Sequence, residues 1–219
     1  MDWSPILISM KTASLSIFIT FFLGIFAAWA VVSMKNETWD GVLTLPLVLP
    51  PTVAGFFLLY MFGVKRPVGQ FFIEYFSVKI AFSWTATVIA AVVMSFPLMY
   101  RSARGAFEQV DQNLVAAART LGMSEWGIFW KVLMTGGLPG VVSGGVLAFA
   151  RGLGEFGATA MIAGNIAGKT RTLPMAVYSE VAAGNMDTAY RYVAVIVVIA
   201  FLSIILMNWA ALRPVNRKG

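Results

Sequence analysis

The sequence predicts an all-α membrane protein that crosses the bilayer about five times. Of its 219 residues, 59% are hydrophobic and only 12% are charged, whereas a soluble domain is about 25% charged. The mean hydropathy is +0.80. Uncharged runs close to the ~20 residues that a helix needs to cross the bilayer recur along the chain. Lipid is therefore the expected solvent.

The residue inventory excludes several classes of function. The chain has no cysteine, so neither a disulfide framework nor a thiolate metal site can form. It also has no histidine, which removes the commonest general base and the usual zinc ligand. An intramembrane enzyme is not expected, because a single acid inside a span, without histidine or cysteine, offers too few catalytic groups. The net charge of +6 is scattered between apolar runs, which favours anionic lipid and an anionic solute over nucleic acid.

Charged residues delimit the predicted spans within one membrane domain, residues 1–219. The spans cover residues 12–34, 43–63, 80–100, 139–165 and 192–212. A sixth segment near 173–183, short or re-entrant, is an alternative. The AWA at 28–30 resembles a cleavage site, but the first apolar run is longer than the ~7–15 residues of a signal-peptide core. We therefore expect a retained first span.

An odd number of spans places the two termini on opposite sides of the membrane. Basic residues divide almost evenly between the sides, so their total does not set the orientation. The tightest basic clusters are Arg101 with Arg104 and the C-terminal RPVNRKG. We expect that side to be cytoplasmic, which leaves the N-terminus outside.

Two of the predicted spans are irregular. The second contains LPLVLPPTVAG, with Pro50 and Pro51, and the fourth reads GVVSGGVLAFARGLGEFGA. Proline removes a backbone donor and kinks a helix, and the freed carbonyl must find a partner inside the protein. Glycine lets helices approach closely. Such helices suit a path that opens and shuts, although ordinary helix packing is an alternative explanation.

The polar loop 101–138 is predicted to fold as helix, turn and helix. VDQNLVAAARTL contains Ala116, Ala117 and Ala118 and is a strong helix former. Gly122 fits the left-handed position that ends a helix, and Ser124 can cap the helix that follows.

A hairpin of this kind is suited to docking. Small side chains let another protein approach closely, while Arg119 and Glu125 can fix the register of the contact. The alternative is an interfacial connector with Trp126, Phe129 and Trp130 at headgroup depth.

The stretch AAARTLGMSEWGIFWKV resembles the EAA loop of binding-protein-dependent ABC transporter permeases. Ala117, Ala118 and Gly122 match that pattern. Ala116 stands in place of its acid and Thr135 in place of its proline. The missing acid argues against a salt bridge from that position to an ATPase, but it leaves the helix–glycine–helix shape intact.

The resemblance extends along most of the chain. LPLVLPPTVAGFFLL, AFSWTATVIAAVVMSFPLMYR, LAFARGLGEFGAT and GNIAGKTRTLP follow one another as in the permease subunits of molybdate ABC transporters. Sulfate and tungstate permeases are close relatives of that family. The resemblance implies a type I ABC importer permease fold in a bacterial inner membrane. It also implies a homodimer, two cytoplasmic ABC ATPase subunits and an extracytoplasmic binding protein.

The chain itself is expected to bind no cofactor, no metal and no nucleic acid. It contains no GxxxxGK[ST] loop for phosphate. The resemblance implies that the partner ATPase uses ATP and Mg.

The resemblance also supplies candidate functional residues. Coupling to the ATPase is expected at Ala116, Ala117, Ala118, Arg119, Gly122, Met123, Ser124 and Glu125. We place the translocation path and gate at Pro50, Pro51, Arg151, Glu155, Gly157 and Thr159. Docking of the binding protein is expected at Lys169 and Arg171, for which solvated loop charge is the alternative.

Arg151 and Glu155 stand four residues apart in an otherwise uncharged stretch. Each charge costs roughly 2.5–3.5 kcal/mol inside a membrane, and this spacing lets the two pair on one helix face. Pairing alone would explain them. In a functional interpretation, Arg151 attracts a divalent oxyanion while Glu155 holds the guanidinium or latches the gate. A proton-coupled transporter with Glu155 as proton carrier is another alternative, but it leaves the polar hairpin unexplained.

Overall fold

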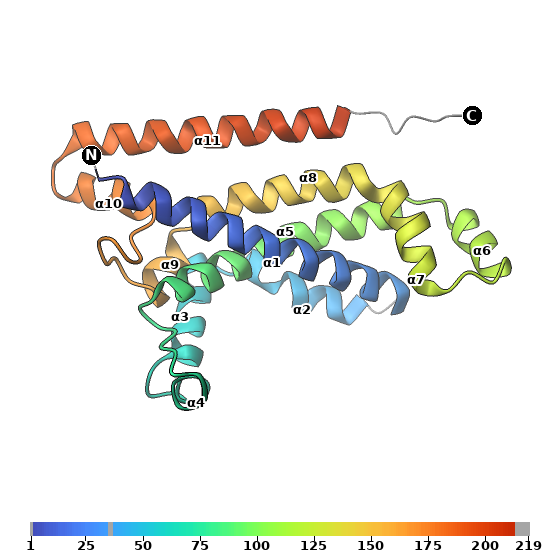
Figure 1. Ribbon diagram of the computed structural model, residues 1–219, viewed down its shortest axis with the longest axis horizontal. Coiled ribbons are helices and arrows are strands. Elements are labelled where there is room, and N and C mark those ends of the chain that lie inside the picture. Colours follow the sequence, from blue (N-terminus) through green and yellow to red (C-terminus); the bar gives the residue numbers. More distant parts are fainter. Residues whose placement is uncertain (1, 35–36, 213–219) are drawn as a thin grey trace.

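The computed structural model describes residues 2–34 and 37–212, and this part of the chain is helical without strands (Figure 1). The helices are α1 (Ser4–Met34), α2 (Glu37–Val48), α3 (Pro51–Phe62), α4 (Pro67–Phe76), α5 (Trp84–Glu108), α6 (Gln112–Thr120), α7 (Glu125–Ile128), the π-helical turn η1 (Phe129–Leu133), α8 (Met134–Leu153), α9 (Gly157–Ile162), α10 (Leu173–Ala182) and α11 (Met186–Leu212).

Four of the described helices are long and apolar enough to cross a bilayer. They are α1, α5, α11 and the continuous rod Glu125–Leu153, which joins α7, η1 and α8. A fifth crossing exists if α2 and α3 count as one span, because they pass the same test together despite a bend of 107°. The predicted all-α class with about five spans is confirmed. Helix α10 has 10 residues, too few to cross the hydrocarbon core.

Several helix boundaries differ from the predicted spans. Helix α1 begins at Ser4, because its polar side chains at this end find partners inside the protein. One such partner is the backbone N–H of Leu173, which donates to Ser9 Oγ over 2.7 Å. The stretch 139–165 is not one helix, since α8 ends at Leu153 and α9 begins at Gly157.

Helix α5 lies at the centre of the bundle, between α1 and α8. A seam of small residues on α1, including Ser16, Thr20 and Gly24, is buried against it. Hydroxyl pairs join the two helices within this seam. Thr20 Oγ1 lies 3.2 Å from Ser95 Oγ, and a second pair lies nearer the start of both helices. Close approach and polar pairing replace the hydrophobic driving force that lipid does not supply.

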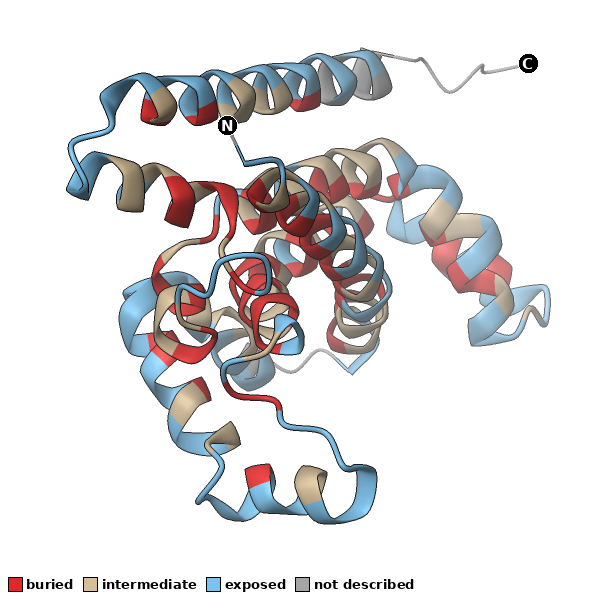
Figure 2. Ribbon diagram, turned by 60° about the vertical axis from the view of Figure 1, so that its left-hand side comes forward, coloured by how far each residue is buried: buried red, intermediate tan, exposed pale blue. Residues whose placement is uncertain are grey.

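Glycines on α8 form the matching seam on the other side of α5. A Cβ built on Gly140 would lie 2.7 Å from the Cβ of Ala106, and one on Gly144 would overlap the side chain of Ser102. Buried residues concentrate where α1, α5, α8 and α9 meet, whereas α4 and α11 are largely exposed (Figure 2). The glycine-rich sequence of the fourth span therefore serves close helix packing.

The hairpin α6–α7 lies at one end of the bundle, which we call the hairpin end (Figure 1). Helix α1 begins at the opposite end, and α11 runs back toward the hairpin end. The helices α3, α4, α9 and α10 also lie away from the hairpin end. The basic cluster RPVNRKG, residues 213–219, lies outside the described residues.

The α5–α8 seam predicts that Gly140→Val destabilises the protein. The added side chain meets Ala106 on α5, and overpacking of this kind costs about 1–3 kcal/mol. Thermal unfolding in detergent should show a lower midpoint than the wild type. Gly41→Val is the matched control, because a Cβ there meets nothing within 4 Å. Equal midpoints for the two variants would contradict the seam.

Candidate functional site

The hairpin is shaped by two caps and one glycine. Asp111 caps α6 by accepting from the N–H of Asn113 over 2.8 Å, a cap that was not predicted from the sequence. Gly122 has a φ of +77°, the left-handed conformation expected of it. Ser124 caps α7 by accepting from the N–H of Gly127 over 3.2 Å. The predicted helix–turn–helix is confirmed.

Aromatic side chains fasten the hairpin to the bundle. Trp126 stacks on Phe26 of α1, with ring centroids 6.1 Å apart and planes 10° apart. Phe129 contacts Trp29 on α1 and Phe107 on α5, with centroids 5.0 and 6.1 Å apart. The hairpin is therefore held by α1 and α5 through a packed cluster, so these rings do more than line an interface with lipid.

One face of the hairpin is exposed and small or apolar. Ala116 and Ala117 are exposed on α6, and Leu114 and Leu121 are exposed beside them. Leu121 is 84% exposed. Neither leucine was predicted as a docking residue from the sequence, although both stand close to the alanine run. A surface of this kind fits the close approach of another protein.

Two predicted coupling residues face inward instead. Ala118 is buried and packs in the core cluster that contains Phe107 and Phe129. Met123 is half-buried and packs against the same cluster. The alanine run therefore presents only its first two members to solvent, because the third faces the bundle.

Arg119 and Glu125 pair with each other across the turn. The guanidinium donates to both carboxylate oxygens, at 2.7 and 3.0 Å. Both side chains are more than half exposed, so the contribution to stability is small.

Pro50 and Pro51 lie at the bend between α2 and α3. Pro50 has φ −53° and ψ 136°, and Pro51 is the first residue of α3. Proline at a first helical position costs no hydrogen bond, while its ring prevents α2 from continuing through the bend. The prolines therefore divide the second span into two rods at 107°.

Helix α3 is tightly joined to α9. A Cβ on Gly55 would lie 2.6 Å from the Cα of Ala158, and a Cβ on Gly157 would lie 2.8 Å from the Cβ of Pro51. Gly157 thus permits contact between the bend and the start of α9. Thr159, two residues on, is fully buried in this joint region.

Arg151 and Glu155 pair at the break between α8 and α9. Arg151 Nη1 lies 2.6 Å from Glu155 Oε2, and the other carboxylate oxygen accepts from the N–H of Ala158 over 2.8 Å. The Glu155 side chain is 1% exposed and that of Arg151 is 28% exposed. Both carboxylate oxygens therefore act as acceptors that hold the break together. Of the two charged groups, only the Arg151 guanidinium is partly exposed.

A hollow near the bend is apolar. It measures about 820 Å³ and lies between α2, α3 and α4, where Leu45, Leu49, Phe57 and Met61 help to line it. Arg151 and Glu155 are not among its lining residues. In the single chain, the two charged residues predicted for the translocation path therefore lie outside this hollow.

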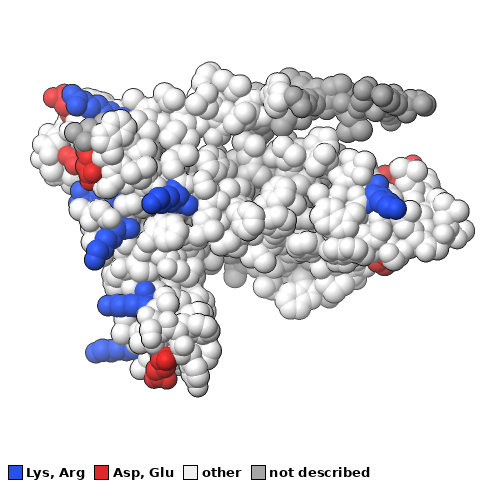
Figure 3. Space-filling model, in the orientation of Figure 1, with Lys and Arg blue, Asp and Glu red and all other residues white. Residues whose placement is uncertain are grey.

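The predicted docking residues lie on a compact loop at the opposite end from the hairpin. Lys169 is exposed and shares a hollow of about 580 Å³ with Lys11 of α1. Arg171 is half-buried, and its Nε donates to Asn165 Oδ1 over 2.9 Å. Arg171 therefore also shapes the loop. Basic side chains gather along this end of the molecule (Figure 3).

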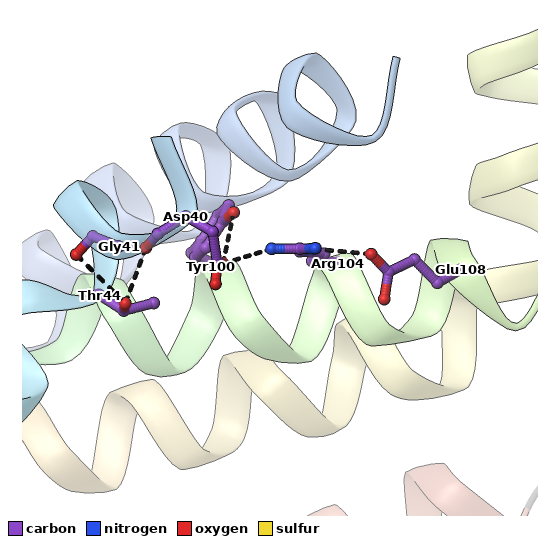
Figure 4. Close-up of polar contacts among 6 residues, drawn as sticks. All are labelled: Asp40, Gly41, Thr44, Tyr100, Arg104 and Glu108. Carbon is purple, nitrogen blue, oxygen red and sulfur yellow. Dashed lines mark hydrogen bonds and ion pairs between the residues drawn. The ribbon is translucent and has the colours of Figure 1, made fainter. Parts of the chain in front are cut away.

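A polar cluster near the hairpin end was not expected from the sequence (Figure 4). Tyr100 and Arg104 of α5 both reach Asp40 of α2, and Arg104 also reaches Glu108. The signal was an acid at the start of the second uncharged run and an arginine pair at the end of the third. Sequence spacing alone could not bring them together, because 60 residues separate Asp40 from Tyr100.

The fold defines the class of the protein. A solved structure titled as inward-facing conformations of the MetNI methionine ABC transporter superposes with a TM-score of 0.73 and 17% identity, covering 94% of this chain and 93% of that chain. The described chain therefore has the fold of a type I ABC importer permease.

The family follows from the sequence comparisons. The family described as binding-protein-dependent transport system inner membrane component matches residues 20–213, and this chain belongs to it. The molybdenum transport system permease protein ModB of Escherichia coli strain K12 is 42% identical, covering 100% of this chain and 97% of that protein. ModB of Haemophilus influenzae is 38% identical with the same coverage. The resemblance inferred from the motifs is confirmed, and the chain is a multi-pass inner-membrane protein.

The Arg151–Glu155 geometry predicts an ordered mutant series. Arg151→Met leaves the buried Glu155 carboxylate without its cation, and breaking a buried pair costs about 3–5 kcal/mol. The double variant Arg151→Met/Glu155→Gln removes both charges and keeps an oxygen for the N–H of Ala158. Thermal unfolding should rank the double variant above the single one. A double variant no more stable than Arg151→Met would contradict this role of the pair.

Proposed function

We propose that this chain is the permease subunit of an ATP-driven importer and forms the transmembrane path for molybdate. Two copies form the path, and two cytoplasmic ABC ATPase subunits dock on the hairpins. An extracytoplasmic binding protein selects the oxyanion and docks at the opposite, basic end. The hairpin end is then cytoplasmic, with the N-terminus of the chain outside. This chain binds neither ATP nor Mg.

The exposed face of the hairpin carries this proposal. Leu114, Ala117 and Leu121 present a small, apolar surface on a hairpin that is rigidly attached to α1 and α5. A membrane connector would have no need of a capped and ion-paired turn at Gly122. A partner that pushes on the hairpin would move both helices with it, since the aromatic cluster joins them.

The choice of molybdate rests on the full-length similarity to ModB proteins. The basic end with Lys11 and Lys169 supports an anionic solute, and Arg151 offers a positive charge along the path. The homodimer is proposed from the similarity to the permease family of binding-protein-dependent transport systems.

Two alternatives make different demands on the same residues. A sulfate or tungstate permease would use the same architecture and differ only in solute. A proton-coupled transporter would use Glu155 as its carrier, yet that side chain is 1% exposed and both of its oxygens already accept hydrogen bonds. A carrier needs access to water on each side in turn, which this arrangement does not favour.

The turn at Gly122 tests the coupling role. Gly122→Val forces a β-branched residue into a φ of +77°, so the hairpin should lose its shape. We expect the variant to stay in the membrane but to lose ATP-dependent uptake and co-purification of the ATPase. Gly122→Asn is the matched control, because asparagine tolerates the left-handed conformation. Normal uptake and ATPase binding by Gly122→Val would contradict the docking role.

Competition assays test the solute. Proteoliposomes with the ATPases and the binding protein should take up labelled molybdate when ATP is present inside. Excess unlabelled molybdate should abolish the signal, and excess sulfate should leave most of it. Uptake that sulfate suppresses as well as molybdate would favour the sulfate alternative. Uptake that follows a proton gradient without ATP would contradict an ABC importer.

A further inference from the structure

The only ion pair that links α2 to another helix among the described residues is the one between Asp40 and Arg104. Arg104 Nη1 lies 2.5 Å from Asp40 Oδ1, and the hydroxyl of Tyr100 donates to the same oxygen over 2.9 Å. Figure 4 shows both α5 side chains directed at Asp40. Arg104 Nε also contacts Glu108 Oε1 at 2.7 Å, within α5. We call Asp40, Tyr100 and Arg104 the α2–α5 clasp.

The α5 side of the clasp is attached to the hairpin. Tyr100 is fully buried in the same core cluster as Phe107, which contacts Phe129 of the hairpin. Arg104 lies on the intervening turn of α5. A displacement of the hairpin therefore reaches the clasp through packed side chains along less than three turns of one helix.

The α2 side of the clasp leads to the bend. Apart from its contact with α5, α2 is poorly covered: Val42 and Leu45 are more than half exposed, and Val48 is 81% exposed. Few apolar contacts thus fix the position of α2, so the polar contact at Asp40 has a large influence on it. The Asp40 side chain is 25% exposed, which strengthens the pair relative to one in open solvent.

The far side of the bend is held by a second ion pair. Helix α3 packs on α9 through Gly55 and Gly157, and Glu155 caps the start of α9 while it pairs with Arg151 of α8. Helix α8 is continuous with α7 of the hairpin. The bend at Pro50–Pro51 therefore lies between two connections to the hairpin, one through α5 and the clasp and one through α8 and α9.

We propose that the α2–α5 clasp couples the hairpin to the bend, with Asp40 and Arg104 as positioning residues. This inference rests on the proposed function. The clasp makes α2 follow the hairpin end of α5, while α3 stays with α9. A displacement of the hairpin that tilts α5 is then carried to α2 by the clasp and changes the angle at Pro50–Pro51. Neither Asp40 nor Arg104 contacts the solute or the ATPase.

Asp40→Asn is the primary test, in proteoliposomes that contain the complete transporter. The variant keeps the shape of the side chain and removes the charge that pairs with Arg104. We expect molybdate uptake per ATP hydrolysed to fall at least about fivefold, the lower end of typical coupling factors. ATP hydrolysis and co-purification of the ATPase should persist. Asp40→Glu keeps the carboxylate and should restore much of the ratio.

Glu108→Gln is the matched control. It removes the other carboxylate partner of Arg104, but that contact lies within α5 and does not reach α2. The ratio of uptake to hydrolysis should stay near the wild-type value. A fall in this ratio as large as that of Asp40→Asn would overturn the proposal. It would show that the ratio depends on any carboxylate partner of Arg104, and not on the link between α5 and α2.

Spin labels give a readout that a loss of general stability would not produce. The chain has no cysteine, so Val42→Cys on α2 and Phe57→Cys on α3 label the two arms of the bend, and both positions are exposed. The label distance should change between the nucleotide-free and the vanadate-trapped complex. Asp40→Asn should abolish that change, whereas Glu108→Gln should preserve it.

Tyr100→Phe provides a second variant if Asp40→Asn does not assemble. It removes only the hydroxyl that donates to Asp40 and keeps the buried ring, so the ratio and the label movement should both decrease. If Asp40→Asn assembles and behaves as the wild type, the proposed role of the clasp is overturned. If it does not assemble, wild-type behaviour of Tyr100→Phe overturns that role in the same way. A wild-type complex without ATP-dependent molybdate uptake would instead contradict the proposed function.

Discussion

The close packing of α5 against α1 and α8 is the interaction on which the rest of the structure depends. Small residues on α1 and glycines on α8 bring both helices against α5, and paired hydroxyls satisfy their polar atoms inside the seam. In lipid, helix association draws on such packing and hydrogen bonding, since burial of apolar surface gives little. This bundle fixes the hairpin at one end and the break between α8 and α9 at the other.

The charges inside the apolar helices are placed where the backbone is interrupted or where two helices meet. Glu155 fills the break after α8 by pairing with Arg151 and capping α9. Asp40 pairs with Arg104 where α2 meets α5. A charge in lipid is tolerated when it is paired and hydrogen-bonded. In the proposed transport cycle the same pairs make the segments that they connect move together.

Rigid and loosely held parts of the chain are distributed unevenly. The hairpin, α5 and α8 share packed cores, and a π-helical turn, a feature found frequently at functional sites, joins α7 to α8. The α2–α3 unit is held by α5 near the start of α2 and by α9 beside the bend, where α2 and α3 meet at 107°. A stiff bundle that carries a hinged arm is a physical arrangement in which a push at one end can become a change of angle at the other.

The sequence by itself determined the membrane class, the capped hairpin with Gly122, the proline bend and the Arg151–Glu155 pairing. Each follows from local rules: hydropathy, the left-handed freedom of glycine, the missing donor of proline and the i,i+4 spacing. Only the tertiary structure decided that Ala118 faces inward, that Leu121 faces out and that Asp40 meets Arg104. It also decided that α9 starts anew after Glu155. Those facts depend on which helix faces pack together, and contacts between distant segments leave no periodic signal in a single sequence.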